Sequence, residues 1–153
     1  MESSRSLKVL ILDTDELFRR SLAFCLQERG CYVLEAAYQA EALEKMCGDD
    51  IDVVLMSLTS LKEESMPLLK RAKQISPLTE VILLTGQTDI SLAIQCMKLG
   101  AFDDFLVPVE VESLLSRITE AWRRKRERLG FETIRIWHGM VMVAETAQPS
   151  VSC

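Results

Sequence analysis

The sequence predicts a single α/β domain, in which a five-stranded parallel β-sheet is covered by helices on both faces. Five short apolar runs alternate along the chain with segments whose apolar residues recur at helical spacing. The runs are apolar at consecutive positions, which is typical of parallel strands that are buried on both faces. The chain has 153 residues, of which 48% are hydrophobic, and is therefore long enough to form one such core.

The five predicted strands cover residues 9–12, 32–34, 53–56, 81–84 and 105–107. The first reads Val-Leu-Ile-Leu, the third Val-Val-Leu-Met and the fourth Val-Ile-Leu-Leu. Runs of this length, bounded by polar residues, favour strands over buried helices.

The predicted helices lie between and after these strands, at about residues 18–26, 40–46, 65–75, 90–99 and 111–122. Gly30 and Gly100 are expected to end the first and the fourth, because glycine readily adopts the backbone conformation found at helix ends. Pro77 follows the third helix and cannot continue it. The last helix has the clearest pattern, with apolar residues at Val111, Leu114, Leu115, Ile118, Ala121 and Trp122.

We expect a domain over residues 7–122 and a basic helical extension with a tail over 123–153, in which the pattern changes beyond residue 129. Residues 123–128 carry five positive charges and one negative charge, in a chain whose net charge is −5. We predict that this run is a solvated extension of the last helix that leads toward another chain or a dimer mate. Nucleic acid, an anionic membrane and an acidic partner are less favoured contacts for it.

Two segments of the tail also have patterns of their own. Apolar residues at positions 131, 134, 136 and 141–143 are compatible with an extra strand or hairpin, but they favour no single structure for residues 130–153. The final residues 148–153 are expected to be disordered.

The cysteines and the apolar runs indicate the cellular compartment of the protein. The five cysteines form no Cys-x-x-Cys pair, and they stand at Cys25, Cys31, Cys47, Cys96 and Cys153. Such thiols are expected to be reduced, in a reducing compartment, and the lone His138 is expected to be structural. The apolar run after the polar N-terminus is too short for a signal peptide or a membrane span. We therefore expect a cytoplasmic protein.

Polar side chains follow the predicted strands at the edge where ligands bind in open parallel sheets. They are Asp13, Thr14 and Asp15 after the first strand, Ser57 after the third and Thr85 after the fourth. The fifth strand is instead followed by Pro108. The residues around these strand ends are the candidates for a functional site.

Four segments in register, 8–13, 52–57, 81–86 and 99–108, resemble the receiver domain of the response regulators of two-component signalling. The resemblance covers roughly residues 7–122. It implies a flavodoxin-like (CheY-like) fold with strand order 2-1-3-4-5, in the cytoplasm of a bacterium. It also implies transfer of a phosphoryl group from a phosphohistidine to an aspartate with the help of Mg²⁺.

Carried over by position, the resemblance places Asp13 at the first acidic position of the metal site, and Thr14 replaces the second. Ser57 replaces the aspartate that accepts the phosphoryl group, whereas Thr85 keeps the hydroxyl position. Val107 replaces the lysine that neutralises charge on the transferring group.

A further replacement affects the switch residue, where Asp104 stands at the position of an aromatic side chain. Asp104 and its neighbour Asp103 are equally well explained as part of a partner surface and as a solvated acidic turn.

These replacements predict that phosphotransfer is absent and that the chain is no enzyme. Mg²⁺ prefers carboxylate oxygens, so a site made of Asp13, Thr14 and Asp15 would be weak at best. Ser57 is a poor nucleophile without an adjacent base, and we expect it to fill a vacated pocket. Asp15 is expected to cap the first helix. The Thr85 hydroxyl is expected to bond to the backbone.

We therefore predict a pseudo-receiver that binds an effector, a histidine kinase or a second copy of itself. The predicted docking face comprises the helix at 90–99, the strand at 105–107 and the helix at 111–122. One alternative is a phosphoacceptor that uses Ser57 or a nearby acid. The other is a flavodoxin-like cofactor binder, which the negative charge at residues 13–16 disfavours, because such a site needs a phosphate-binding loop there.

Overall fold

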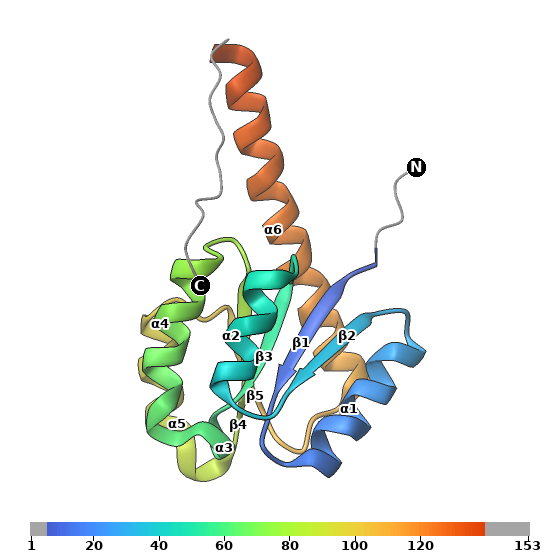
Figure 1. Ribbon diagram of the computed structural model, residues 1–153, viewed down its shortest axis with the longest axis vertical. Coiled ribbons are helices and arrows are strands. Elements are labelled where there is room, and N and C mark those ends of the chain that lie inside the picture. The colour runs from blue at the N-terminus through green and yellow to red at the C-terminus, as the bar shows by residue number, and fades with distance from the viewer. Residues whose placement is uncertain (1–5, 140–153) are drawn as a thin grey trace.

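The computed structural model describes residues 6–139, and it describes side chains up to residue 130. Its centre is one parallel sheet in the order β2-β1-β3-β4-β5, which confirms the predicted topology (Figure 1). The strands are β1 (Lys8–Leu12), β2 (Tyr32–Ala36), β3 (Val53–Ser57), β4 (Glu80–Thr85) and β5 (Asp103–Leu106).

Helices cover both faces of this sheet, as predicted. They are α1 (Glu16–Glu28), α2 (Gln39–Gly48), α3 (Leu58–Leu61), α4 (Ser65–Ile75), α5 (Ile90–Lys98) and α6 (Val111–Gly139). Two short 3₁₀ turns, η1 (Lys62–Glu64) and η2 (Gln87–Asp89), precede α4 and α5. The short helix α3 and the turn η1 occupy the segment between the predicted third strand and the helix at 65–75, where no helix was predicted.

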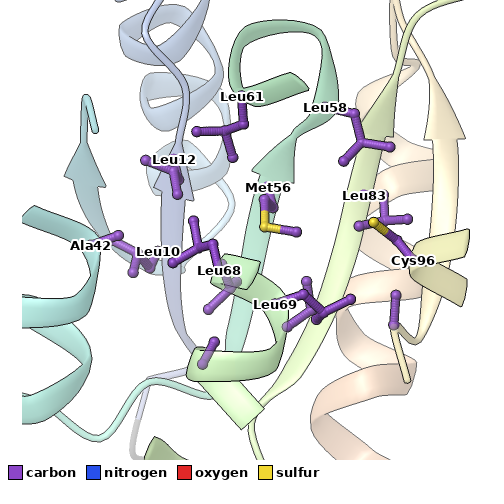
Figure 2. Close-up of a cluster of buried hydrophobic side chains, with 14 of the residues drawn as sticks. Leu10, Leu12, Ala42, Met56, Leu58, Leu61, Leu68, Leu69, Leu83 and Cys96 are labelled. Atoms are coloured by element: carbon purple, nitrogen blue, oxygen red, sulfur yellow. The ribbon is translucent and has the colours of Figure 1, made fainter. Parts of the chain in front are cut away.

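The strands divide their side chains between two apolar cores. Leu10 and Leu12 of β1 point to the face covered by α2, α3, α4 and α5, where Figure 2 shows them packed with Leu68 and Leu69. The alternate residues of β1 point to the opposite core, where α1 and α6 contribute Leu26 and other apolar side chains. This alternation explains why the strands are apolar at every position.

The edge strand β5 differs from its prediction. It begins at Asp103, two residues before the expected start, and pairs with β4 through Ile82 and Asp103. A polar start is tolerated because an edge strand leaves one side open to solvent. The apolar pattern at 105–107 therefore marked only the end of the strand.

Helix α6 also differs from its prediction, because it continues without a break from Val111 to Gly139. Residues 131–136, for which the sequence left a strand or hairpin open, are therefore helical, and residues 141–143 lie outside the described residues. The Arg, Lys and Glu residues that follow residue 122 are strong helix formers, which favours continuation of the helix. His138 lies in this part of α6, where side chains are not described.

The basic run of α6 is not a solvated extension at every position. Lys125 is only 5% exposed, and its Nζ atom lies 3.1 Å from Asp52 Oδ1 and 3.0 Å from Asp50 Oδ1. It also donates to the carbonyl oxygen of Ile51 at 3.0 Å. Asp52 in turn accepts a hydrogen bond from the Lys8 amide. Lys125 thus joins α6 to the edge where β1 and β3 begin.

A second group of charges lies beside this one, around the buried carboxylate of Glu80 at the start of β4. Arg124 and Arg128 approach Glu80 Oε2 at 3.3 and 3.1 Å, and Lys73 of α4 approaches its other oxygen at 3.9 Å. Contacts between α6 and the sheet therefore continue to Arg128, beyond the boundary expected at residue 122. From there the helix projects past the sheet (Figure 1).

Within residues 6–139, no helix, including the long α6, combines the length and the apolar character needed to cross a membrane.

Replacing Lys125 with Met is expected to lower the free energy of unfolding by about 3–5 kcal/mol, because it leaves the buried Asp52 carboxylate without its cation. Urea unfolding followed by circular dichroism measures this loss. The matched control is Arg123→Met, an exposed position on the same helix, whose effect is expected to stay within about 0.5 kcal/mol. Equal stabilities of the two variants would contradict the anchoring role of Lys125.

Candidate functional site

The predicted site residues meet in a cavity of about 320 Å³ at the edge where the strands end. It is lined by Asp13, Thr14, Asp15, Phe18, Ser57, Thr59, Ser60 and Val107. The structure therefore brings together five of the seven residues that the sequence singled out. Thr85 and Asp104 are not among the lining residues.

Asp13 is the buried acid of this cavity, with 4% of its surface exposed. Its Oδ1 atom accepts a hydrogen bond from the Asp15 amide at 2.9 Å. Burial raises the pKa of Asp13 above its ordinary value, although hydrogen bonds from Asp15, Ser57 and Ser60 act in the opposite direction. The ionised form of this carboxyl group is therefore disfavoured in the folded protein.

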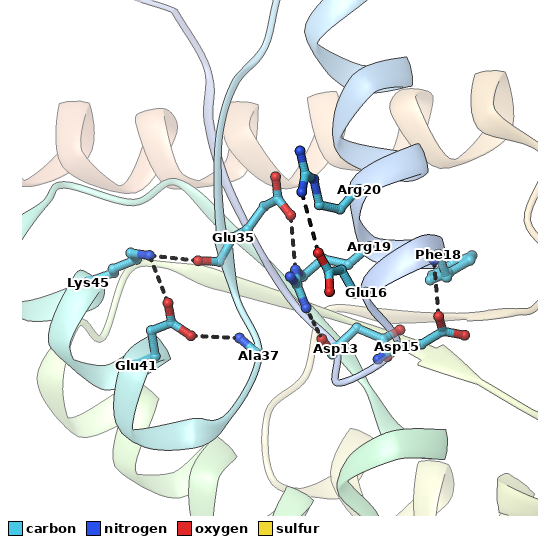
Figure 3. Close-up of polar contacts among 10 residues, drawn as sticks. All are labelled: Asp13, Asp15, Glu16, Phe18, Arg19, Arg20, Glu35, Ala37, Glu41 and Lys45. Atoms are coloured by element: carbon cyan, nitrogen blue, oxygen red, sulfur yellow. Dashed lines mark hydrogen bonds and ion pairs between the residues drawn. The ribbon is translucent and has the colours of Figure 1, made fainter.

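A guanidinium group lies beside Asp13 but is engaged elsewhere. Arg19 donates from Nη1 to the carbonyl oxygen of Asp13 at 2.8 Å and from Nε to Glu35 at 2.9 Å (Figure 3). Arg19 therefore joins α1 to the segment after β1 and to β2.

Asp15 caps α1, which confirms its predicted role. Its Oδ1 atom accepts the amide hydrogen of Phe18 at 3.2 Å, and Thr14 between the two acids is exposed. The oxygen atoms of Asp13, Thr14 and Asp15 do not fit as the ligands of a tight Mg²⁺ site. Burial raises the pKa of one carboxyl group, the other already caps a helix, and the position between them offers only a hydroxyl.

Ser57 is buried, with 3% of its surface exposed, and it ends β3 where the family has its phosphoacceptor. Its Oγ atom accepts the Ser60 amide at 3.3 Å and so caps α3. This cap was not predicted, because no helix was expected directly after the third strand. A serine directly before an apolar residue, here Leu58, is typical of a helix N-cap and could have indicated it.

Two further predicted positions are Thr85, which ends β4, and Val107, which lines the cavity. The Thr85 side chain is buried, and its Oγ1 atom has no hydrogen-bond partner among the described residues. The expected bond from this hydroxyl to the backbone is therefore wrong. The carbonyl oxygen of Thr85 accepts a hydrogen bond from the amide of Val107 at 3.0 Å. The half-buried Val107 itself brings an apolar side chain to the place of a lysine.

The structure adds residues that the sequence analysis did not single out. Thr59 and Lys62 follow β3, and both donate to the buried carboxylate of Asp89, which follows β4. Each of these two bonds measures 3.1 Å. No local pattern identifies this group, because its members come from separate loops.

The predicted docking face is partly apolar on the surface. Ile90, Ile94 and Met97 of α5 are exposed at helical spacing, and Leu106 of the neighbouring β5 is 54% exposed. Asp104 is exposed on the same strand.

Arg117 of α6 borders this face. It pairs with Asp103 at 2.6 Å and stacks over Phe102, 5.1 Å from the ring centre. Asp103 is therefore part of an ion pair with α6, whereas its neighbour Asp104 is exposed to solvent.

Comparison with known proteins identifies relatives for most of the chain. FixJ, a transcriptional regulatory protein of Azorhizobium caulinodans, is 31% identical over 130 residues, which cover 80% of this chain and 62% of FixJ. A putative NtrX-like response regulator of Rickettsia typhi is 29% identical, over 83% of this chain and 28% of its own length. The chain thus spans less than two thirds of the length of these relatives.

Solved structures agree with this result. A response regulator receiver domain from Clostridium thermocellum is 34% identical and superposes with a TM-score of 0.72, over 78% of this chain and 96% of its own. Full-length FixJ from B. japonicum is 27% identical with a TM-score of 0.76, over 86% of this chain and 64% of its own. The family described as the response regulator receiver domain matches residues 9–119. Together with the sheet order and the cavity at the strand ends, these matches show that the chain belongs to the response regulator receiver family.

Proposed function

We propose that this chain is a pseudo-receiver, which accepts no phosphoryl group at Ser57 and acts through contacts with other proteins in a bacterial two-component pathway. The observation that carries this proposal is the chemical environment of the Ser57 hydroxyl. Its hydroxyl stands in place of a carboxylate nucleophile, is buried, and already caps α3.

The surroundings of Ser57 provide little stabilisation for a transferring phosphoryl group. Such a group needs cations to neutralise its oxygens. Val107 supplies none, and the ammonium group of Lys62 is paired with Asp89.

One observation favours the alternative of a substitute phosphoacceptor. Asp13 lines the same cavity as Ser57 and has a raised pKa, which is one requirement for a general base. A base alone leaves the charge of the phosphoryl group unbalanced, so we rank this function second.

The cofactor alternative has less support. A flavin phosphate needs amide donors at the start of α1, and the Asp15 carboxylate already occupies the Phe18 amide there.

The apolar strip on α5 and β5 supports a function in protein binding. It consists of Ile90, Ile94, Met97 and Leu106, all exposed. An effector domain, a histidine kinase or a second copy of this chain would bury it. NtrX and FixJ are named as regulators, which supports an effector as one such partner.

Incubation with acetyl phosphate or a phosphohistidine donor is expected to give no stable phosphorylation of the full chain. Intact-mass spectrometry at neutral pH measures it, and a typical receiver domain serves as the positive control. An added phosphoryl group that survives acid would place an ester on a hydroxyl, whereas an acid-labile one would place it on a carboxylate. Either product would overturn the proposal, and Ser57→Ala would locate the ester.

Replacing Asp13 with Asn is expected to raise the stability at pH 7. The pKa of Asp13 is raised on folding, so its ionised form costs stability at neutral pH, and this cost disappears as the pH falls through the pKa of the folded state. The advantage of the variant should therefore shrink in acid. Urea unfolding at several pH values measures it.

The same variant tests the metal site. Millimolar Mg²⁺ is expected to leave the melting temperature of the wild-type chain unchanged. A Mg²⁺-dependent increase in the wild type that Asp13→Asn abolishes would show that the site still binds the metal.

Replacing Ile94 with Asp is expected to weaken any assembly through the α5–β5 face at least about tenfold, because it places a charge in the centre of the apolar strip. Analytical ultracentrifugation measures self-association of the full chain. Leu17→Asp is the matched control, since Leu17 is 78% exposed on α1. A chain ended after residue 130 keeps Lys125 and Arg128 and so tests separately whether the end of α6 contributes. A dimer that only this truncation dissolves would contradict the proposed face.

A further inference from the structure

The carboxylate of Asp89 joins two loops at the edge of the sheet that carries the cavity. Its Oδ2 atom accepts a hydrogen bond from Thr59 Oγ1, and its Oδ1 atom accepts one from Lys62 Nζ, both at 3.1 Å. Thr59 and Lys62 lie in the segment after β3, whereas Asp89 lies between β4 and α5. We call these three residues the Asp89 clasp.

The position of Asp89 in its own helix is the first sign that the clasp has a specific role. Asp89 stands at the N-cap of α5, where an aspartate usually accepts an amide hydrogen of the first helical turn. Here its side chain makes no such bond, and it is only 5% exposed. The carboxylate is therefore turned from its own helix toward the neighbouring loop.

The backbone of Lys62 is the second sign. Its φ angle is 52°, in the left-handed region that glycine adopts more easily than other residues. A lysine in this conformation carries strain, which persists only where the surroundings compensate for it. The ion pair of its ammonium group with the buried Asp89 is such a compensation.

The contact at Gly86 is the third sign. A Cβ atom added there would lie 2.9 Å from Thr59 Oγ1 and 3.1 Å from Asp89 Oδ2. Only a residue without a side chain allows the loops to approach this closely. Three separate features of the chain are thus consistent with one close contact between the loops.

The charge of Asp89 is maintained inside the clasp. Burial acts to raise its pKa, but the hydrogen bonds from Lys62 and Thr59 outweigh this effect and hold the pKa below its ordinary value. The clasp therefore contains an ionised carboxylate at neutral pH, with a cation and a hydroxyl as its donors.

We propose that Asp89 is a built-in anion that locks the loop after β3 to the loop before α5, so that α5 keeps one position without a bound phosphoryl group. The lock would hold Ile90, which follows Asp89 directly, and Ile94, about one helical turn later, in a fixed orientation. This consequence for the α5–β5 face rests on the proposed function, whereas the lock itself is a property of the isolated chain.

Two variants of the full chain test the lock from its two sides. Lys62→Gly removes the ammonium group and at the same time relieves the strained backbone, and Asp89→Asn removes the charge without changing the backbone at residue 62. Glu63→Gly is the control, because it adds a glycine at an exposed position of the same loop. Amide hydrogen exchange followed by mass spectrometry measures the opening of each loop.

Both clasp variants are expected to increase exchange about tenfold or more in residues 58–64 and also in residues 86–94, while Glu63→Gly affects at most its own loop. Unchanged or slower exchange at 86–94 in Lys62→Gly would overturn the lock. In that case the glycine would have relieved the backbone strain at residue 62 without releasing the loop before α5. Exchange increased equally by all three variants would also overturn it. Phosphorylation of the chain would refute the proposed function but would not alter this readout.

Discussion

A carboxylate that is removed from water must find partners inside the protein, and this constraint organises both edges of the domain. Asp52 and Glu80 are buried where the strands begin, and Asp13 and Asp89 are buried where they end. An unpaired charge in such a place costs more free energy than a single hydrogen bond returns. Each buried carboxylate therefore requires that neighbouring segments place hydrogen-bond donors or cations beside it.

At the edge where the strands begin, basic residues of α6 pair with the buried carboxylates. Lys125 neutralises Asp52, and two arginines neutralise Glu80. The helix is thereby fixed to the sheet by charge as well as by its apolar residues Leu114 and Ile118. Replacing a buried ion pair by apolar residues is often neutral for stability, so its value here lies in the position it gives to the helix.

At the opposite edge the two acids differ. Asp89 has a cation and a hydroxyl as partners and remains ionised, whereas Asp13 has an amide and hydroxyls, and its pKa is raised. This edge of the sheet therefore holds one acid whose pKa is raised by burial and another whose carboxylate is paired with a cation.

The sequence was sufficient for the sheet and for the cavity, because both depend on local patterns. Apolar runs defined the strands, and the ends of parallel strands must lie at one edge, so Asp13, Ser57 and Val107 could be placed together. The start of β5 at Asp103 was missed because edge strands tolerate polar residues.

The remaining features depend on contacts between segments that are far apart in the chain. Lys62 and Asp89 are 27 positions apart, and Asp52 and Lys125 are 73 positions apart. Neither pair has a signature in the local sequence. The basic run of α6 was therefore interpreted as solvated, and the Asp89 clasp was not anticipated.

The continuous helix α6 has a consequence for anything joined to its end. The helix is held at Lys125 and Arg128, and it continues to Gly139 without interruption. Each residue of an α-helix adds a rise of about 1.5 Å and a rotation of about 100°. The direction in which a joined segment faces would therefore depend on the number of residues between Arg128 and that segment. Inserting one residue would turn the segment by more than a quarter of a circle, whereas inserting seven would return it close to its original face.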